Sequence, residues 1–211
     1  MQLIEALAVA FGIVYLLLAV REHRACWYAA AVSTALSVWL FWSVSLPMES
    51  ALNVYYLFMA GYGWWQWRQP GQTAASSVAE APLAIRRFSL REHSLAITTV
   101  ALLTLVSGTL LHHQTAAALP FLDSFTTWGS VITTWMVARK ILENWLYWLV
   151  IDSASILLYL DRELYLYAGL FALYLVIAVF GWLGWRRSYR DAQPLAATAG
   201  AAERGNGSTN Q

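Results

Sequence analysis

The sequence contains one cysteine, Cys26, and few charged residues for its length. A single cysteine excludes an intramolecular disulfide. Charged residues make up 12% of the 211 residues, about half the share found in soluble domains. The net charge of +1 argues against a nucleic-acid-binding protein, which needs a concentrated basic face. The composition therefore indicates that lipid, rather than water or nucleic acid, surrounds most of the chain.

Sequence signatures of enzymes and metal centres are also missing. The chain has no G-x-x-x-x-G-K-[ST] P-loop, no H-E-x-x-H and no G-x-S-x-G pattern, so nucleotide hydrolysis and common hydrolase chemistries are not indicated. The adjacent pair His112 and His113 does not have the spacing of metal ligands. We therefore expect no enzyme, no metal and no cofactor.

Long apolar runs are what the sequence has instead. Hydrophobic residues make up 59% of the chain, and the mean hydropathy is +0.51. Runs of about 17 to 25 apolar residues span a bilayer as helices, which predicts seven such helices at roughly residues 3–20, 26–45, 50–67, 94–111, 124–138, 144–160 and 164–185. The first run is expected to be a permanent helix, because no basic segment typical of a signal peptide precedes it. Beyond the last run, residues 188–211 are expected to be a disordered tail.

Basic residues are concentrated in alternate connections between these helices. Twelve of the thirteen Lys and Arg residues fall on one side: Arg21, Arg24, Arg68, Arg86, Arg87, Arg91, Arg139, Lys140, Arg186, Arg187, Arg190 and Arg204. Only Arg162 falls on the other. By the positive-inside rule this predicts an N-terminus outside, a cytoplasmic C-terminus and an odd number of crossings. We therefore expect a multi-pass protein of the inner membrane.

Tryptophan is the other abundant residue, with twelve in the chain. Several lie beside the arginines at predicted helix ends: Trp64, Trp65, Trp67, Trp182 and Trp185. Amphipathic rings settle at the headgroup level of a bilayer. We interpret most of these residues as interfacial anchors, with the lipid bilayer as their partner.

The two ends of the chain resemble each other when one is shifted by 118 residues. In this ungapped frame Arg21 coincides with Arg139, Trp27 with Trp145, Ser37 with Ser155, Leu40 with Leu158, Tyr56 with Tyr174, and a G-W-x-x-W-R pattern at 63–68 with another at 181–186. Trp and Arg recur at any membrane border, but a shared pattern in one frame favours a repeat.

The repeat predicts an all-α integral membrane fold with a 3+1+3 arrangement. Its parts are a three-helix repeat over 1–68, a cytoplasmic linker and connector helix over 69–120, and a second three-helix repeat over 121–187. Three helices plus one connector is an even number, so both triplets face the same way. Parallel repeats of this kind hold transporter substrates near the midplane between the halves.

Asp152 is the one carboxylate near the middle of a predicted membrane helix. It lies nine residues after Glu143 and nine before Asp161. A charge at mid-bilayer costs roughly 2.5 to 3.5 kcal/mol, and such residues mark ligand sites or polar pathways. Trp145, Trp148, Asp152 and Ser155 share one helix face by their spacing, and two indoles beside a carboxylate suit a flat cationic ring. The alternatives are a protonated Asp152 bonded to another helix and, for Trp145, an interfacial anchor.

Asn53 and Tyr56, in the third predicted helix, are a second polar candidate. Asn53 would equally link two helices, an interaction of roughly 0.6 kcal/mol in membranes. In the first repeat, the positions equivalent to Trp148 and Asp152 hold Ala30 and Thr34. This difference is expected if one asymmetric ligand lies between the two halves.

Two segments are similar to signature regions of the PnuC family of vitamin transporters. One is Arg139-Lys-Ile-Leu-Glu-Asn-Trp-Leu-Tyr-Trp-Leu-Val-Ile-Asp152, with Asp123-Ser-Phe upstream. The other runs from Asn53 through Gly61-Tyr-Gly-Trp-Trp-Gln-Trp67. The similarity covers about residues 1–68 and 120–187, and its E-N-W-x-x-W motif is the most specific part.

This resemblance implies a SWEET-like fold, a homotrimer and uptake of nicotinamide riboside, an NAD precursor. Transport would proceed by facilitated diffusion, with a separate cytoplasmic kinase trapping the product. The resemblance places ligand-binding residues around the E-N-W-x-x-W motif, which adds Asn144 to Trp145, Trp148, Asp152, Ser155, Asn53 and Tyr56. It departs at Asp152, where nicotinamide riboside transporters carry Asn. Thiamine, also a cationic aromatic vitamin, is therefore an alternative substrate.

Overall fold

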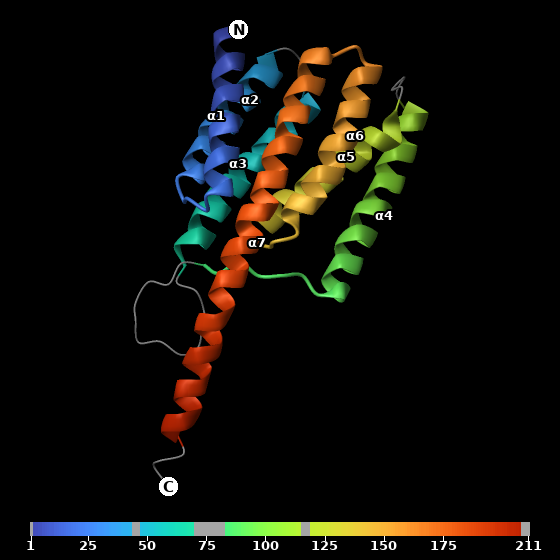
Figure 1. Cartoon of the computed structure of the whole chain (residues 1–211). Coiled ribbons are helices and arrows are strands. Elements are labelled where there is room, and N and C mark those ends of the chain that lie inside the picture. The colour runs from blue at the N-terminus through green and yellow to red at the C-terminus, as the bar shows by residue number, and fades with distance from the viewer. Residues whose placement is uncertain (1, 44–46, 70–82, 115–118, 208–211) are drawn as a thin grey trace.

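The protein folds into seven α-helices in a computed structural model that describes residues 2–43, 47–69, 83–114 and 119–207 (Figure 1). They are α1 Gln2–Val20, α2 Cys26–Ser43, α3 Pro47–Arg68, α4 Leu90–Gln114, α5 Pro120–Ala138, α6 Asn144–Asp161 and α7 Tyr165–Gly207. The prediction of seven helices is confirmed. Because α5 begins four residues before its predicted start, Asp123 lies in its first turn rather than ahead of it.

Short sequence signals set the helix ends. Proline is the first residue of α3 and α5, where its missing N–H costs nothing. A capping box begins α4: the Ser89 N–H donates to the Glu92 carboxylate at 2.7 Å, and the Glu92 N–H faces the Ser89 hydroxyl at 3.4 Å. Two residues beyond α1, α5 and α6, the chain turns through a left-handed residue: Glu22 with φ 54°, Lys140 with φ 49° and Glu163 with φ 57°.

The helices pack as two groups joined along two seams. In one group α2 packs against α1 and α3, and in the other α6 packs against α5 and α7. The seams are α1 against α7 and α3 against α5. Helix α4 packs against α5 and stands at the outer edge of the bundle in Figure 1. The first helix of each group therefore packs against the third helix of the other group.

The helix composition is that of a multi-pass membrane protein. Helix α1, residues Leu90–His113 of α4 and residues Tyr165–Gln193 of α7 are long and apolar enough to cross a membrane. The other helices are less hydropathic because they carry more Trp, Tyr, Ser and Thr, and several of these side chains line an internal cavity.

Matching contacts recur 118 residues apart. Gly63 on α3 lies under the ring of Trp27, and Gly181 on α7 lies under the ring of Trp145. A Cβ on either glycine would lie 2.3 Å or 2.5 Å from the nearest ring atom. Only glycine lets the two helices approach this closely. The correspondence read from the sequence is therefore also present in the packing.

One end of the bundle, here called the basic end, holds the connections 21–25, 83–89 and 139–143. Residues 83–89 run along this end of the bundle to the start of α4 (Figure 1). Arg86 forms a parallel bridge with the 139–143 connection: its N–H donates to Lys140 O at 3.1 Å, and the Leu142 N–H donates to Arg86 O at 2.9 Å. The rest of the predicted linker, 70–82, lies outside the described residues.

Glu143 also holds residues 83–89 in place. Its buried carboxylate accepts hydrogen bonds from Arg87 Nε at 2.8 Å and from the Phe88 N–H at 3.0 Å. The bond to Glu143 raises the pKa of the Arg87 guanidinium, so this cation stays charged at every physiological pH. The linker is thereby held against the connection between α5 and α6.

Two expectations were wrong. Helix α7 continues to Gly207, so residues 188–207 are helical rather than disordered, while 208–211 lie outside the described residues. The run after Leu195 is rich in alanine, the strongest helix former. Trp67 and Trp185 are 1% and 0% exposed, so they are core residues and not interfacial anchors. Trp65, at 53% exposure, remains free to act as one.

Candidate binding cavity

A cavity of about 270 Å³ lies inside the bundle and is lined by all the helices except α4. Fourteen of its lining residues are seven pairs related by the 118-residue shift: Gly12 and Ser130, Leu16 and Thr134, Trp27 and Trp145, Ala30 and Trp148, Thr34 and Asp152, Asn53 and Phe171, Tyr56 and Tyr174. The cavity therefore lies between the two helix groups, where corresponding positions face each other.

Five of the seven predicted site residues line this cavity. They are Asn53 and Tyr56 from α3 and Trp145, Trp148 and Asp152 from α6. The spacing along α6 places Trp145, Trp148 and Asp152 on one helix face, and the fold turns that face inward. The sequence-based prediction that two indoles and a carboxylate share one compartment agrees with this geometry.

Asn144 and Ser155 do not line the cavity. Asn144 is fully buried and its Nδ2 donates to Ile141 O at 2.6 Å, which places it in the connection before α6. The Ser155 hydroxyl donates to Ile151 O of its own helix at 2.9 Å. Ser155 lies about one turn beyond Asp152 and is not among the residues that line the cavity. Its counterpart Ser37 is also absent from the lining.

Within the part of the chain that the structure describes, Asp152 is the only carboxylate that lines the cavity. The residue is 3% exposed, and it takes part in none of the four ion pairs between described side chains. Removing an unpaired charge from water is costly unless an opposite charge or hydrogen bonds compensate it. The site therefore offers a carboxylate whose counter-charge is not supplied by the described part of the protein.

The tryptophans of α6 have different surroundings. Trp145 is 1% exposed, and its ring is held between Gly181 and Trp185, with a ring-centre distance of 5.5 Å to Trp185. The interpretation of Trp145 as an interfacial anchor is therefore wrong. Trp148, one turn further, is only partly buried, so more of its indole is available to a ligand.

Asn53 and Tyr56 contribute from α3. The Asn53 amide donates to Glu49 O of its own helix at 2.9 Å, so the bond that is seen does not link two helices. Its carbonyl oxygen is left for other partners. Tyr56 on α3 and its counterpart Tyr174 on α7 both line the cavity.

Sequence reasoning missed several lining residues, most clearly Trp27 and Tyr174. The 118-residue shift pairs these two with Trp145 and Tyr56, which were candidates. Applying the repeat to the candidate list would have found both. The same shift pairs Phe171 with the candidate Asn53, so it would have found this lining residue as well.

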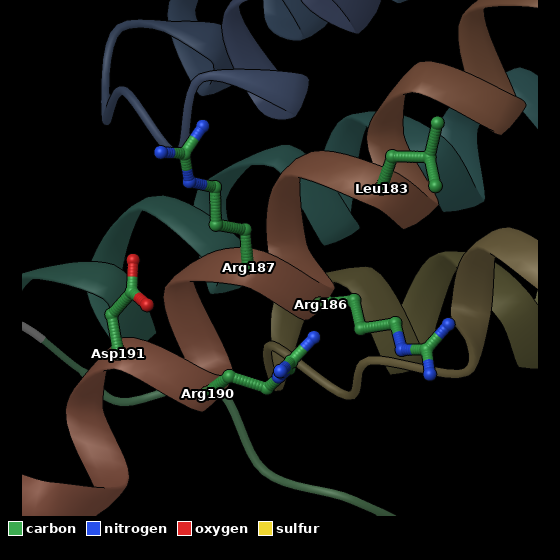
Figure 2. Close-up of a pocket in the computed structure, with 5 residues that line it drawn as sticks. All are labelled: Leu183, Arg186, Arg187, Arg190 and Asp191. Carbon is green, nitrogen blue, oxygen red and sulfur yellow. The ribbon is translucent and has the colours of Figure 1, made fainter.

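Two other hollows are less suited to a small-molecule site. One of about 530 Å³ on the basic end is lined by Arg186, Arg187, Arg190 and Asp191. Figure 2 shows Arg186 and Arg187 leaving α7 in different directions, so the cations do not converge on one point. The other, about 680 Å³, lies between α4, α5 and α6 and is lined almost entirely by apolar side chains.

These features define a polytopic helical membrane protein with a small, partly polar cavity between two groups of helices. Comparison with known proteins identifies its family. The family model described as nicotinamide mononucleotide transporter matches residues 2–187, which is most of the chain. The protein belongs to this family.

Its relatives carry vitamins. The nicotinamide riboside transporter PnuC of Escherichia coli (strain K12) is 25% identical over 207 residues, covering 89% of this chain and 87% of the relative. The riboflavin/roseoflavin transporter RibM of Streptomyces davaonensis is 23% identical over 193 residues, covering 90% and 88%. These relatives are transporters and not enzymes, so the chain is a member of a vitamin transporter family.

A solved structure shares the fold. The chain matches a crystal structure of the vitamin B3 transporter PnuC with a TM-score of 0.71, over 90% of this chain and 83% of that one. The identity is 21%, so this match concerns the fold alone.

Proposed function

We propose that this protein takes up nicotinamide riboside across the inner membrane by facilitated diffusion, and that a separate cytoplasmic kinase traps the product. The observation that carries the proposal is Asp152, a buried carboxylate without a protein counter-charge, in a cavity that also holds Trp148 and Tyr174. Nicotinamide riboside carries a fixed positive charge on a flat ring. Stacking and cation–π attraction bind such a ring, and the carboxylate supplies its counter-charge.

The cavity size and charge favour nicotinamide riboside over riboflavin. A volume of about 270 Å³ is just below the roughly 300 to 1,000 Å³ of drug-sized ligand sites. A nucleoside with a single-ring base suits this space better than riboflavin, whose ring system has three rings and no positive charge to pair with Asp152. Thiamine is the second candidate, because its ring is also cationic and Asp152 favours a cation without selecting between the two.

Uncoupled transport is supported by the composition of the lining. Apart from tyrosines, Asp152 is the only ionisable residue among the described residues that line the cavity. A proton relay through a membrane protein uses chains of Asp, Glu or His, and a single carboxylate that pairs with the substrate is not such a chain.

We further propose that α1–α3 and α5–α7 are parallel repeats joined by α4, in a 3+1+3, SWEET-like arrangement. The recurrence of the Gly63–Trp27 contact at Gly181–Trp145 supports it. The twelve basic residues predict that the basic end faces the cytoplasm. A homotrimer is proposed from the family resemblance.

Counterflow in proteoliposomes is the direct test. Vesicles loaded with unlabelled nicotinamide riboside should accumulate labelled nicotinamide riboside without any ion gradient, and should do so far faster than vesicles loaded with thiamine or riboflavin accumulate theirs. We expect Asp152→Ala and Trp148→Ala to abolish saturable counterflow while leaving expression near normal.

Matched controls keep this test specific. Ser153→Ala alters an α6 residue that is exposed and bonds Leu149 O of its own helix, and Trp39→Ala removes an indole that is 52% exposed. Both should transport like the unmodified protein. Faster counterflow of thiamine would overturn the substrate, and normal transport by both cavity variants would overturn the site.

A further inference from the structure

Four buried tryptophans separate the cavity from the basic end. Trp27 and Trp145 line the cavity. Trp67 meets Trp27 edge-on at a ring-centre distance of 5.5 Å, Trp185 meets Trp145 in the same way at 5.5 Å, and Trp67 and Trp185 lie 6.0 Å apart. None of the four is more than 2% exposed. They form a closed layer of indoles, here called the indole layer, on the basic side of the cavity.

Two hydrogen bonds tie this layer across the seams of the bundle. The Trp67 indole, on α3, donates to Ala138 O at 3.1 Å, at the end of α5. The Trp185 indole, on α7, donates to Ala19 O at 3.0 Å, at the end of α1. Each group of helices therefore holds the end of the other group's first helix. These bonds must lengthen or break if the two groups separate at this end.

An ion pair lies beside the layer at corresponding positions of the two groups. Lys140 Nζ is 2.9 Å from Glu22 Oε2, and the two residues are 118 apart. The side chains are 5% and 23% exposed, and the ammonium lies 4.7 Å from the centre of the Trp67 ring. Both residues have left-handed backbone conformations, in the turns that follow α1 and α5. Each turn closes with the same bond, from His23 N–H to Leu18 O and from Ile141 N–H to Met136 O, both 3.0 Å.

A largely buried ion pair gains little net stability, because desolvation opposes the attraction. Its best-attested use is to select one arrangement over another. The Glu22–Lys140 pair is placed for that use, since it joins the first group to the second and exists only while the two turns are close. The ion pairs Arg86–Glu92 and Arg87–Glu143, also at the basic end, do not cross the seams between the two groups.

We propose that the Glu22–Lys140 pair and the two indole hydrogen bonds are the latch of a gate between the cavity and the basic end. This inference rests on the proposed transport function. With the latch closed, the indole layer blocks the basic side of the cavity. Opening requires Lys140 to leave Glu22 and Trp67, while Trp67 and Trp185 release Ala138 and Ala19. The latch therefore sets how much of the time the cavity is open to that side.

Accessibility of the cavity tests this without any substrate. In a Cys26→Ala background, Thr34→Cys places one thiol in the cavity lining, and a membrane-impermeant maleimide is applied from either side of oriented vesicles. We expect slow labelling from the basic side in this parent. Glu22→Lys or Lys140→Glu should raise that rate at least about fivefold, the usual lower bound for coupling between two states. The double variant Glu22→Lys/Lys140→Glu should return it to the parent value, because the pair is restored in reverse.

Glu22→Gln is the milder variant if a charge reversal prevents folding, and it should shift labelling in the same direction. Glu92→Gln is the matched control, since it removes an ion pair at the same end that does not cross between the groups; it should leave labelling unchanged. Equal increases from both sides, unchanged labelling in Glu22→Gln, or no recovery in the double variant would overturn the latch. If nicotinamide riboside is not the substrate, counterflow fails in the parent too, while this labelling pattern persists.

Discussion

Replacing Gly181 by alanine tests how tightly the cavity wall is packed. A Cβ at this position would lie 2.5 Å from Cδ2 of Trp145, whereas carbon atoms normally approach to about 3.5 to 4.0 Å. The ring has little room to move, because Trp145 is 1% exposed and meets Trp185 edge-on at a ring-centre distance of 5.5 Å, and its one open side is the cavity that it lines. The helix or the indole must therefore shift by about 1 Å.

The cost follows from this overlap. Forcing an extra methyl group into a packed core costs about 1 to 3 kcal/mol, and alanine returns up to about 1 kcal/mol as the better helix former. Gly169→Ala isolates the first term. Gly169 lies on the same helix and has no atom within 4 Å of an added Cβ, so it receives the helix-forming gain alone. The difference between the two variants is then the overlap cost of about 1 to 3 kcal/mol.

The assay is thermal unfolding of the purified protein in detergent. For a chain of this length, about 1 kcal/mol shifts the midpoint by roughly 2 to 4 °C, so Gly181→Ala should unfold roughly 2 to 12 °C below Gly169→Ala. Gly63→Ala, whose Cβ would lie 2.3 Å from the Trp27 ring, and Gly61→Ala, with open space, should give a similar difference on α3. Equal midpoints within either pair would refute the close packing.

Further predictions concern charge. Asp152→Asn keeps the side-chain shape but removes the counter-charge. The KM for nicotinamide riboside should therefore rise about ten- to a hundredfold, because a hydrogen bond to a charged group contributes about 1.5 to 3 kcal/mol. An unchanged KM in proteoliposome uptake would contradict the charge pairing. Glu143→Gln weakens the anchor of Arg87 and the Phe88 N–H, so trypsin should cut after Arg87 faster than in the unmodified protein. Equal digestion rates at that bond would show that Glu143 does not hold the linker.

The sequence was most informative where burial in lipid leaves a simple pattern. Apolar runs predicted seven helices, because a membrane helix must be apolar over about twenty residues. The 118-residue shift predicted which positions correspond, since Trp27 and Trp145 each meet a glycine in the same way. Helix periodicity likewise brought Trp145, Trp148 and Asp152 to one face.

The pattern failed where one residue type suits two environments. A tryptophan beside an arginine at a helix end fits an interfacial belt and a closed core equally well, and only packing distinguishes Trp67, which is buried, from Trp65, which is exposed. Periodicity gives the face of a helix but not which residues on that face reach a site, so Ser155 shares a face with Asp152 yet does not line the cavity. The lining residues from α1, α2 and α7 come from the tertiary fold, which no single helix pattern contains.

The anchoring of residues 83–89 gives the two halves of the molecule unequal sizes. Helix α4 packs on α5, and the segment before it is bound to Lys140, Leu142 and Glu143. If one half rocks against the other, α4 therefore moves together with the second half. By these contacts, α1–α3 form a body of three helices and α4–α7 a larger body of four. In the proposed transport cycle the cavity would therefore lie between two bodies of unequal size.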